Sequence, residues 1–345
     1  MSGENKKHIE GAALLRVLGG LAIVLLHTMN ISELLWHDDL TLAQERLSMA
    51  VVYSLMWAVP VFIMVSGALL LDPLREMSIR KIYGNYVFRV VIALAVFIFI
   101  FRLFDMVMNK EKFTVIIIVE SIYKFISNSS WSHLWYLYIL IGLYLLLPAY
   151  RMIAAAADEK MYDYLFVTGM FFLSLIPAIE STVSKIAFGI QIPAVYTLYF
   201  FAGYGISSGK LKIPKEWGML LFILGNLLSL FLMIMSWKLP MSGIESVLSS
   251  YASPAVVLEA LGLFSVLWDC KLSDGLRTVV SIQDTAGFGL YLIHMIPLRL
   301  ILKYSGLNPY DVGWAAFVFI WAGCYAMAIL ITALLRRIPF VRRVL

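Results

Sequence analysis

The sequence predicts an all-α polytopic membrane protein with about ten transmembrane helices and both termini in the cytoplasm. Of its 345 residues 61% are hydrophobic and only 14% are charged, with a mean hydropathy of +0.87. Soluble domains carry about 25% charged residues and need a polar shell. Apolar runs of membrane-spanning length recur without a long polar break, and lysine and arginine are unevenly distributed between the connecting loops.

The ten predicted spans are continuously apolar, which favours helices over the alternating pattern of a β-barrel. The first run carries Arg16 and His27, so we expect a retained span and not a signal peptide. An eleventh segment, 113–127, is apolar but short; it predicts an outer-surface helix, with a re-entrant element as the alternative. We expect a single membrane-embedded domain over 1–345, with spans near 11–30, 49–71, 82–107, 133–152, 161–180, 192–208, 216–237, 250–268, 284–303 and 313–335.

Loop charges predict the orientation, because cytoplasmic loops collect lysine and arginine. With a cytoplasmic N-terminus, the inner side holds sixteen basic residues: Lys6, Lys7, Arg75, Arg80, Lys81, Arg151, Lys160, Lys210, Lys212, Lys215, Lys271, Arg277, Arg336, Arg337, Arg342 and Arg343. The outer side then holds six: Lys110, Lys112, Lys124, Lys185, Lys238 and Lys303.

Two polar residues share the first span. Arg16 and His27 are eleven residues apart, which is close to three helical turns, so they lie on one face and about 16 Å apart along the axis. Gly19 and Gly20 between them allow close approach of a helix or a ligand. Charged residues inside the bilayer are costly and mark functional sites. The structural alternative is an arginine that snorkels to the inner headgroups and a histidine that bonds a neighbouring helix.

Basic residues also begin the third span. Arg80 and Lys81 lie at its cytoplasmic mouth and Arg89 lies about two turns deeper. Together they predict an anion-binding funnel for a phosphate-bearing cofactor, although positive-inside bias is an equal explanation for the first two. Arg102, near the other end of that span, is expected to pair with Asp105.

A third group of candidates combines histidines with aromatic residues. His133, Trp135 and Tyr136, beside Trp131, begin the fourth span, either as a stacking platform for a sugar or as part of the interfacial aromatic belt. Tyr291 and His294 lie one turn apart in the ninth span. Histidine suits general acid–base or nucleophilic work because its ordinary pKa lies near physiological pH.

Several motif classes are missing from the sequence. It contains no P-loop, G-x-G-x-x-G, HExxH or G-x-S-x-G motif, and no carboxylate pair stands out within a span. Ser66-Gly67 is read as a helix-packing pair. Cys270 and Cys324 are read as small buried residues, without disulfide or metal spacing, and no metal site is expected.

Four of these segments, in order, resemble the acyltransferase-3 family of bacterial integral membrane acyltransferases. Arg16 and His27 match the family's R-x10-H pattern, and "VPVFIMVSGALLL" is similar to its second span. "HLWYLYILIGLYLLLPAYR" matches the fourth span, and "GFGLYLIHMIPL" matches the late Y-L-x-H segment at Tyr291 and His294. The resemblance covers nearly the whole chain and implies a standalone member without the soluble esterase-like domain that some members append.

The resemblance implies transfer of an acyl group, usually acetyl from cytoplasmic acetyl-CoA, to a cell-surface carbohydrate or its lipid-linked precursor. It implies catalytic roles for His27 and Arg16 and a donor-binding role for Arg89, with Arg80 and Lys81 nearby. The family often has two adjacent basic residues just before that arginine, whereas this chain has Gly84, Asn85 and Tyr86. Acetyl and succinyl donors both stay open, because Arg102 and Arg299 are available to bind a second carboxylate.

The alternative function is a transporter or flippase for a small solute or an acylated precursor, which fits the number of spans. Against it stand the missing inverted repeat and the scattered prolines Pro60, Pro148 and Pro297. Under either function we expect a multi-pass protein of the bacterial inner membrane, contacting lipid and no nucleic acid.

Overall fold

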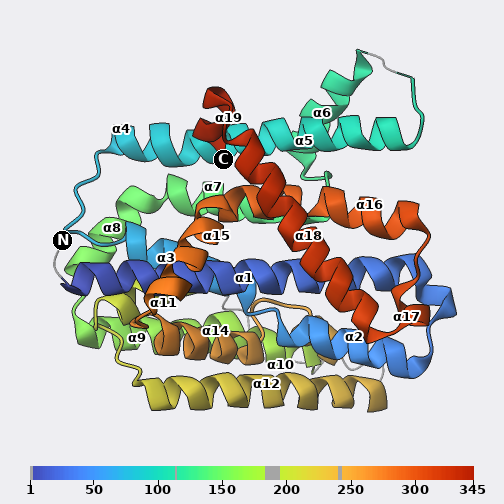
Figure 1. The fold of residues 1–345 in the computed structure, drawn as a ribbon. Helices are drawn as coiled ribbons and strands as arrows, with labels where there is room; N and C mark the ends of the chain where they lie inside the picture. The colour runs from blue at the N-terminus through green and yellow to red at the C-terminus, as the bar shows by residue number, and fades with distance from the viewer. Residues whose placement is uncertain (1–2, 113–114, 183–194, 240–242) are drawn as a thin grey trace. The chain divides into compact units, whose positions relative to one another are not determined.

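The computed structural model describes residues 3–112, 115–182, 195–239 and 243–345. Within these ranges every regular element is a helix, which confirms the all-α prediction (Figure 1). By contact the chain forms two compact units: unit 1 comprises Met1–Asp72 and Ala156–Ile331, and unit 2 comprises Pro73–Ala155 and Thr332–Leu345. A single membrane domain stays a prediction.

Unit 1 contains the first three helices and most of the second half of the chain. Its elements are α1 (Gly3–Trp36), η1 (His37–Asp39), α2 (Leu42–Ser54), α3 (Ala58–Leu70), α9 (Glu159–Met170), η4 (Phe171–Leu175), α10 (Ile176–Thr182), α11 (Val195–Ser207), α12 (Lys215–Lys238), α13 (Ile244–Leu248), α14 (Pro254–Leu267), α15 (Asp274–Ile293), α16 (Met295–Ser305), α17 (Pro309–Val312) and most of α18 (Trp314–Leu335).

Unit 2 is smaller. Its elements are α4 (Ile79–Lys81), the π-helix η2 (Ile82–Val87), α5 (Phe88–Met108), α6 (Ile116–Ser127), η3 (Ser132–Leu134), α7 (Trp135–Leu145), nearly all of α8 (Leu147–Ala156), the end of α18 and α19 (Pro339–Val344).

Six helical stretches are long and apolar enough to cross a membrane, and up to eight if two bent pairs each count as one span. Each of the ten predicted segments contains a helix where it is described, but α11 and α14 have only 13 and 14 residues. The count of ten is therefore not confirmed. Residues 192–194 of one predicted span, 113–114 of the short segment and Lys185 of an outer loop lie outside the described residues.

Two spans are bent, and a proline accounts for each bend. α7 and α8 meet at 59° beside Pro148, and α15 and α16 meet at 53° beside Pro297. Proline lacks the N–H that would continue the helix and clashes with the preceding turn. Pro148 and Pro297, two of the three prolines noted in the sequence, therefore each mark a bent span.

Glycines allow the closest helix contacts in unit 1. A Cβ on Gly67 of α3 would lie 1.9 Å from the carbonyl oxygen of Phe200 in α11, so only glycine fits there. This confirms Gly67 of the Ser66-Gly67 pair as a helix-packing residue, while Ser66 Oγ donates to the Phe62 carbonyl of its own helix. Similarly, a Cβ on Gly262 of α14 would lie 2.5 Å from the carbonyl oxygen of Gly218 in α12. Close backbone approach through small residues is how helices associate in lipid.

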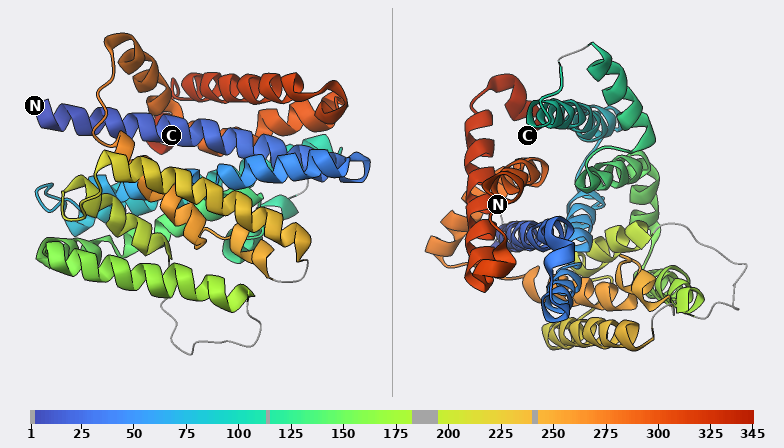
Figure 2. Two further views of the ribbon diagram at one scale, coloured as in Figure 1. Left: turned by 90° about the horizontal axis from the view of Figure 1, so that it is seen from below. Right: turned by 90° about the vertical axis from the view of Figure 1, so that its right-hand side faces the viewer.

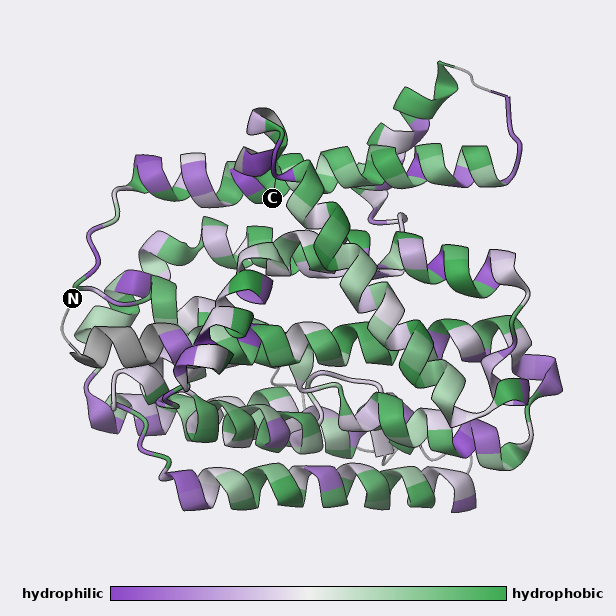
Figure 3. Cartoon of the chain, in the orientation of Figure 1, coloured by the Kyte–Doolittle hydropathy of each residue, from purple (hydrophilic) through white to green (hydrophobic). Residues whose placement is uncertain are grey.

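The long helices of unit 1 lie lengthwise in one view and nearly end-on in the other (Figure 2). Hydrophobic residues predominate along the helices, and hydrophilic residues gather at helix ends, as α12 shows clearly (Figure 3). α1 is packed against α3 and α15. This arrangement, with helices apolar on most sides, is that of a multi-pass membrane protein.

Candidate functional site

A row of polar pairs joins α1 to α15 and is called the polar ladder here. Its three rungs are Glu10–Arg277, Arg16–Asp284 and His27–His294. The first and last rungs are 17 residues apart on both helices. Equal spacing means that α1 and α15 run parallel and in register over about 25 Å.

The third rung brings two imidazole rings together. The ring centroids of His27 and His294 are 5.2 Å apart, and His294 is fully buried. Nδ1 of His294 is 2.7 Å from the carbonyl oxygen of Tyr291. A carbonyl only accepts, so Nδ1 carries the proton, and Nε2 of the neutral ring carries the lone pair. The structure thus brings together three of the predicted residues.

His294 also marks the bend between α15 and α16. Because Pro297 has no N–H for the carbonyl of Ile293, the helix breaks at the turn that holds His294. The backbone oxygen of His294 accepts from Leu298 N at 3.1 Å and from Cys324 Sγ at 3.2 Å. The histidine predicted at mid-span therefore sits at a hinge, a position that re-aims a side chain.

The second rung is a two-fold ion pair. Nε and Nη2 of Arg16 donate to the two carboxylate oxygens of Asp284 at 2.6 and 2.8 Å. As predicted from their spacing, Arg16 and His27 share a face of α1, because both meet α15. Sequence reasoning missed Asp284, which is the first residue of the predicted span 284–303.

The first rung closes one end of the ladder. Oε1 of Glu10 accepts from Nε of Arg277 at 2.7 Å, and Oε2 accepts from Leu272 N at 3.0 Å. Arg277 was counted only as an inner-loop charge in the sequence, so its partner in α1 is a finding of the structure.

The glycines between Arg16 and His27 contact other helices. A Cβ on Gly19 would lie 3.0 Å from Phe62 of α3, and one on Gly20 would lie 3.4 Å from Leu290 of α15. The predicted close approach is therefore that of helices. α18 crosses α1 here (Figure 1), and Trp321 Nε1 donates to the Leu21 carbonyl oxygen at 3.0 Å.

The predicted donor-binding cations belong to unit 2. Arg80 and Lys81 are exposed in α4, and Arg89 lies in the first turn of α5. The π-helix η2 separates them, and such wide turns occur often at functional sites. Nε and Nη2 of Arg89 donate to the backbone oxygens of Val344 and Leu345 at 3.0 and 2.7 Å, which ties α19 to α5.

The predicted acceptor-binding residues of the fourth span also belong to unit 2. His133 and Tyr136 are buried and Trp135 is half-buried. Trp131 stacks on Phe101, with centroids 4.2 Å apart and ring planes 8° apart. One face of this indole is therefore already covered, so it cannot offer both faces to a sugar.

Arg102 of α5 pairs with residues other than the one expected. It makes ion pairs with Glu111 and Glu120 at 2.8 and 2.6 Å, whereas the expected partner, Asp105, accepts from Trp131 Nε1 at 3.0 Å. The hydrogen bond from Arg102 holds the pKa of the Glu111 carboxyl below its usual value. The pair with Glu120 joins α5 to α6, the helix predicted over 113–127.

A buried carboxyl group was also missed. Glu259 of α14 is fully buried, with Oε1 accepting from Ser229 Oγ of α12 at 3.0 Å. Its other oxygen has no hydrogen-bond partner among the described residues. The charge within an apolar run was the signal available in the sequence.

No group of three or more metal-ligating side chains of suitable geometry occurs within the described ranges. The sequence profile of the acyltransferase-3 family, described as an acyltransferase domain, matches residues 9–337. No curated protein and no solved structure matches the chain significantly. The match spans both units and includes all three rungs of the polar ladder.

Proposed function

The chain belongs to the acyltransferase-3 family and is a membrane acyltransferase, and from this premise we propose that it is an O-acyltransferase of the bacterial inner membrane. Its donor is cytoplasmic acyl-CoA, with acetyl-CoA as the first expectation. Its acceptor is a hydroxyl of a cell-surface carbohydrate or of the lipid-linked precursor. The observation that carries the proposal is the His27–His294 pair at a bent span.

His27 is the general base of the proposed reaction. It accepts the proton of the acceptor hydroxyl as that oxygen attacks the thioester carbonyl. The new C–O bond forms, the C–S bond breaks, and the proton passes from the imidazole to the departing thiolate sulfur. His27 is partly exposed and His294 is fully buried, so His27 is the ring that a substrate can reach.

His294 acts as the positioning residue beside it. Two imidazolium rings 5.2 Å apart would repel each other strongly in apolar surroundings, so at most one ring is charged at a time. The hydrogen bond to Tyr291 fixes the orientation of His294.

Donor binding is assigned to the cations of unit 2. Arg80, Lys81 and Arg89 begin one span and supply positive charge where a coenzyme phosphate would arrive. Arg16 and its partner Asp284 hold α1 and α15 in register below the imidazole pair. His294 positions His27 and does not itself touch the acceptor. The acceptor-binding role expected of Tyr291 in unit 1, and that of His133, Trp135 and Tyr136 in unit 2, stays a prediction.

The test is thioester cleavage by the purified full chain in lipid nanodiscs. The rate at which CoA thiol is released from acetyl-CoA, with water as a slow acceptor, reports on the general base. This measurement does not require the glycan acceptor to be known. His27→Ala should lower the rate by about 10²-fold or more, while His37→Ala, an exposed histidine in η1, should leave it unchanged. Wild-type rates in purified His27→Ala would refute the assignment.

The transporter alternative predicts a different result in the same assay. A transporter of a small solute has no reason to bind a CoA thioester, whereas an acyltransferase binds and slowly hydrolyses it. The bent spans, with His294 at a break, are the feature that favours transport. Mass spectrometry of envelope glycans with and without the protein then identifies the acceptor.

A further inference from the structure

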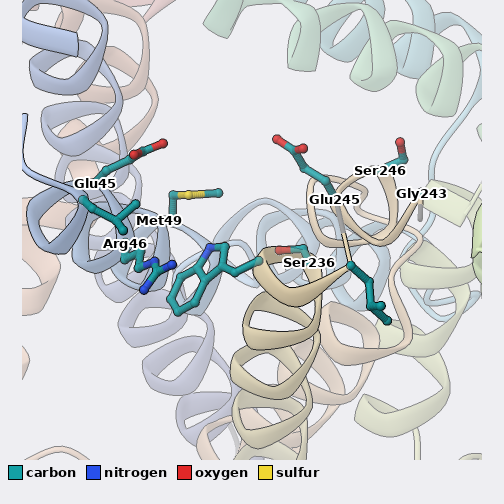
Figure 4. Close-up of a pocket in the computed structure, with 10 residues that line it drawn as sticks. Glu45, Arg46, Met49, Ser236, Gly243, Glu245 and Ser246 are labelled. Carbon is teal, nitrogen blue, oxygen red and sulfur yellow. The ribbon is translucent and has the colours of Figure 1, made fainter. Parts of the chain in front are cut away.

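A polar pocket lies in unit 1 where α2, α12 and α13 meet, with a volume of about 510 Å³. It is called the rim pocket here, and Figure 4 shows the side chains around it. This volume lies within the about 300–1,000 Å³ of small-molecule sites. Its lining consists of Leu42, Glu45, Arg46, Met49, Ser236, Trp237, Leu239, Gly243, Glu245 and Ser246.

The rim pocket lies at the end of the helices remote from the start of α1. Glu45 and Met49 are in the first turns of α2, which follows the end of α1, and Trp237 is in the last turn of α12. With the predicted cytoplasmic N-terminus, this is the outer end. A glycan acceptor would arrive from that side.

Three charged side chains surround the pocket without neutralising one another. Glu45, Arg46 and Glu245 make no side-chain hydrogen bond or ion pair with any residue that the structure describes. The Arg46 guanidinium instead lies over the Trp237 ring, 4.6 Å from its centroid. Its Nε and the indole N–H are buried and find no acceptor among the described residues. The two carboxylates and the remaining N–H groups of the Arg46 guanidinium therefore stay available to a ligand in the pocket.

This set of groups suits a sugar ring. Carboxylates accept hydrogen bonds from hydroxyls, the guanidinium and the serine hydroxyls donate to ring and hydroxyl oxygens, and an indole edge packs against the apolar C–H surface. Two carboxylates against one guanidinium leave a net charge of about −1. That charge repels phosphate and uronic acids and tolerates a neutral or amine-bearing sugar.

Packing connects the rim pocket to the level of the histidine pair. Met49 and Trp237 share an apolar cluster with Tyr53 of α2, and Tyr53 also packs against the cluster of Leu26, the neighbour of His27. Along α2, Met49 lies four residues before Tyr53 and Glu45 lies eight residues before it. The pocket thus lies about 6–12 Å further along the helix axes than the histidines.

We propose that the rim pocket is an acceptor subsite, which binds a neutral or amine-bearing sugar next to the residue that receives the acyl group. This rests on the proposed function above. Binding energy from a sugar that does not react positions the reacting hydroxyl at His27. The acceptor is then at least a disaccharide, and its anchoring sugar is not acidic.

The experiment measures sugar binding separately from chemistry. Saturation-transfer NMR of the full chain in nanodiscs uses maltose, chitobiose, its de-N-acetylated diamine and digalacturonate as probes. We expect at least one uncharged or amine-bearing disaccharide to bind and digalacturonate not to bind. Binding of digalacturonate alone, or of none of the four, overturns the proposal.

Variants then place the site. Glu245 is exposed, so Glu245→Gln leaves folding intact and should weaken binding at least fivefold, and Trp237→Phe should do likewise. Their matched controls are Glu216→Gln and Trp217→Phe at the opposite end of α12, which should bind as wild type. Equal binding by the pocket variants and wild type overturns the assignment.

Two further results separate this proposal from the proposed function. His27→Ala should bind the disaccharide normally yet fail to cleave acetyl-CoA. Glu216→Gln, at the opposite end of α12 and outside both sites, should bind the disaccharide and cleave acetyl-CoA as wild type does. If wild type binds the sugar but never cleaves the thioester, the acyl-CoA function fails while the rim pocket stands; if it cleaves but binds no probe, the rim pocket fails alone.

Discussion

The Arg16–Asp284 pair should couple α1 to α15 energetically, and a double-mutant cycle measures that coupling. The perturbations are Arg16→Gln, Asp284→Asn and the two together. Each single change leaves one charge without its partner between two helices, whereas the double change removes both charges at once. The helices should therefore tolerate the double variant better than the sum of the single losses predicts.

The structure sets the size of this coupling. The two charge-assisted hydrogen bonds measure 2.6 and 2.8 Å, and each such bond contributes about 1.5–3 kcal/mol net. The side chains of Arg16 and Asp284 are 30% and 21% exposed, so solvent screening reduces the sum by about half. A coupling free energy of about 2 kcal/mol follows, or about 30-fold in the unfolding equilibrium.

The assay is SDS titration of the purified chain in mixed micelles, followed by tryptophan fluorescence, for the four proteins of the cycle. A second cycle at Lys212 and Glu159 is the matched control, because that pair is 69% and 60% exposed. Its coupling should stay below about 0.5 kcal/mol. If the Arg16–Asp284 coupling is no larger than that of the control pair, the pair does not hold the helices in register.

Three further predictions concern packing, the bend and pH. Gly67→Ala should lower the free energy of unfolding by about 3 kcal/mol, because the added Cβ would lie 1.9 Å from a carbonyl oxygen. Gly323 has open space around it, so Gly323→Ala should leave the free energy of unfolding unchanged in the same SDS titration. Pro297→Ala restores a backbone N–H donor and should reduce the 53° bend between α15 and α16. The rate of acetyl-CoA cleavage should then fall, while the free energy of unfolding stays as in wild type. An unchanged rate of cleavage would contradict a role for the bend. The folded pKa of Glu111 is lowered by Arg102, so its stabilisation is complete above the unfolded pKa of about 4.3 and is lost as the pH falls through the folded value. The midpoint temperature of thermal unfolding should therefore differ between Glu111→Gln and wild type at neutral pH, and the two values should converge in acid. A difference that stays constant across pH would be inconsistent with this reasoning.

The helical fold could be predicted from sequence because each helix satisfies its own backbone, so a long apolar run is nearly sufficient evidence. The shared face of Arg16 and His27 was equally predictable, since it depends on helical periodicity alone. Both bends were signalled by prolines that the sequence shows. Long-range partners were not predictable: Asp284 lies 268 residues from Arg16, and one chain alone does not reveal which helices pack together.

The number of spans is not confirmed, for a related reason. Hydropathy extended the span near 250–268 across residues that the structure places outside a helix, because α14 begins only at Pro254. Arg102 was matched to its nearest carboxylate in sequence, whereas folding of α6 back onto α5 supplied Glu120 instead. Local patterns predict elements; the partners of charged residues depend on tertiary contacts.

The polar ladder separates structural charge from the chemistry of the histidines. Arg16 is about 16 Å from His27 along α1, where a lone unit charge acts with about 1 kcal/mol at an effective dielectric constant of about 20. Asp284 neutralises that charge through two hydrogen bonds, so the imidazole pair experiences almost no net field from the rung below. Asp284→Asn should therefore lower stability by more than it changes the strength of His27 as a base. A shift of more than tenfold in the rate of thioester cleavage, in protein that remains folded, would mean that Arg16 acts directly on a substrate.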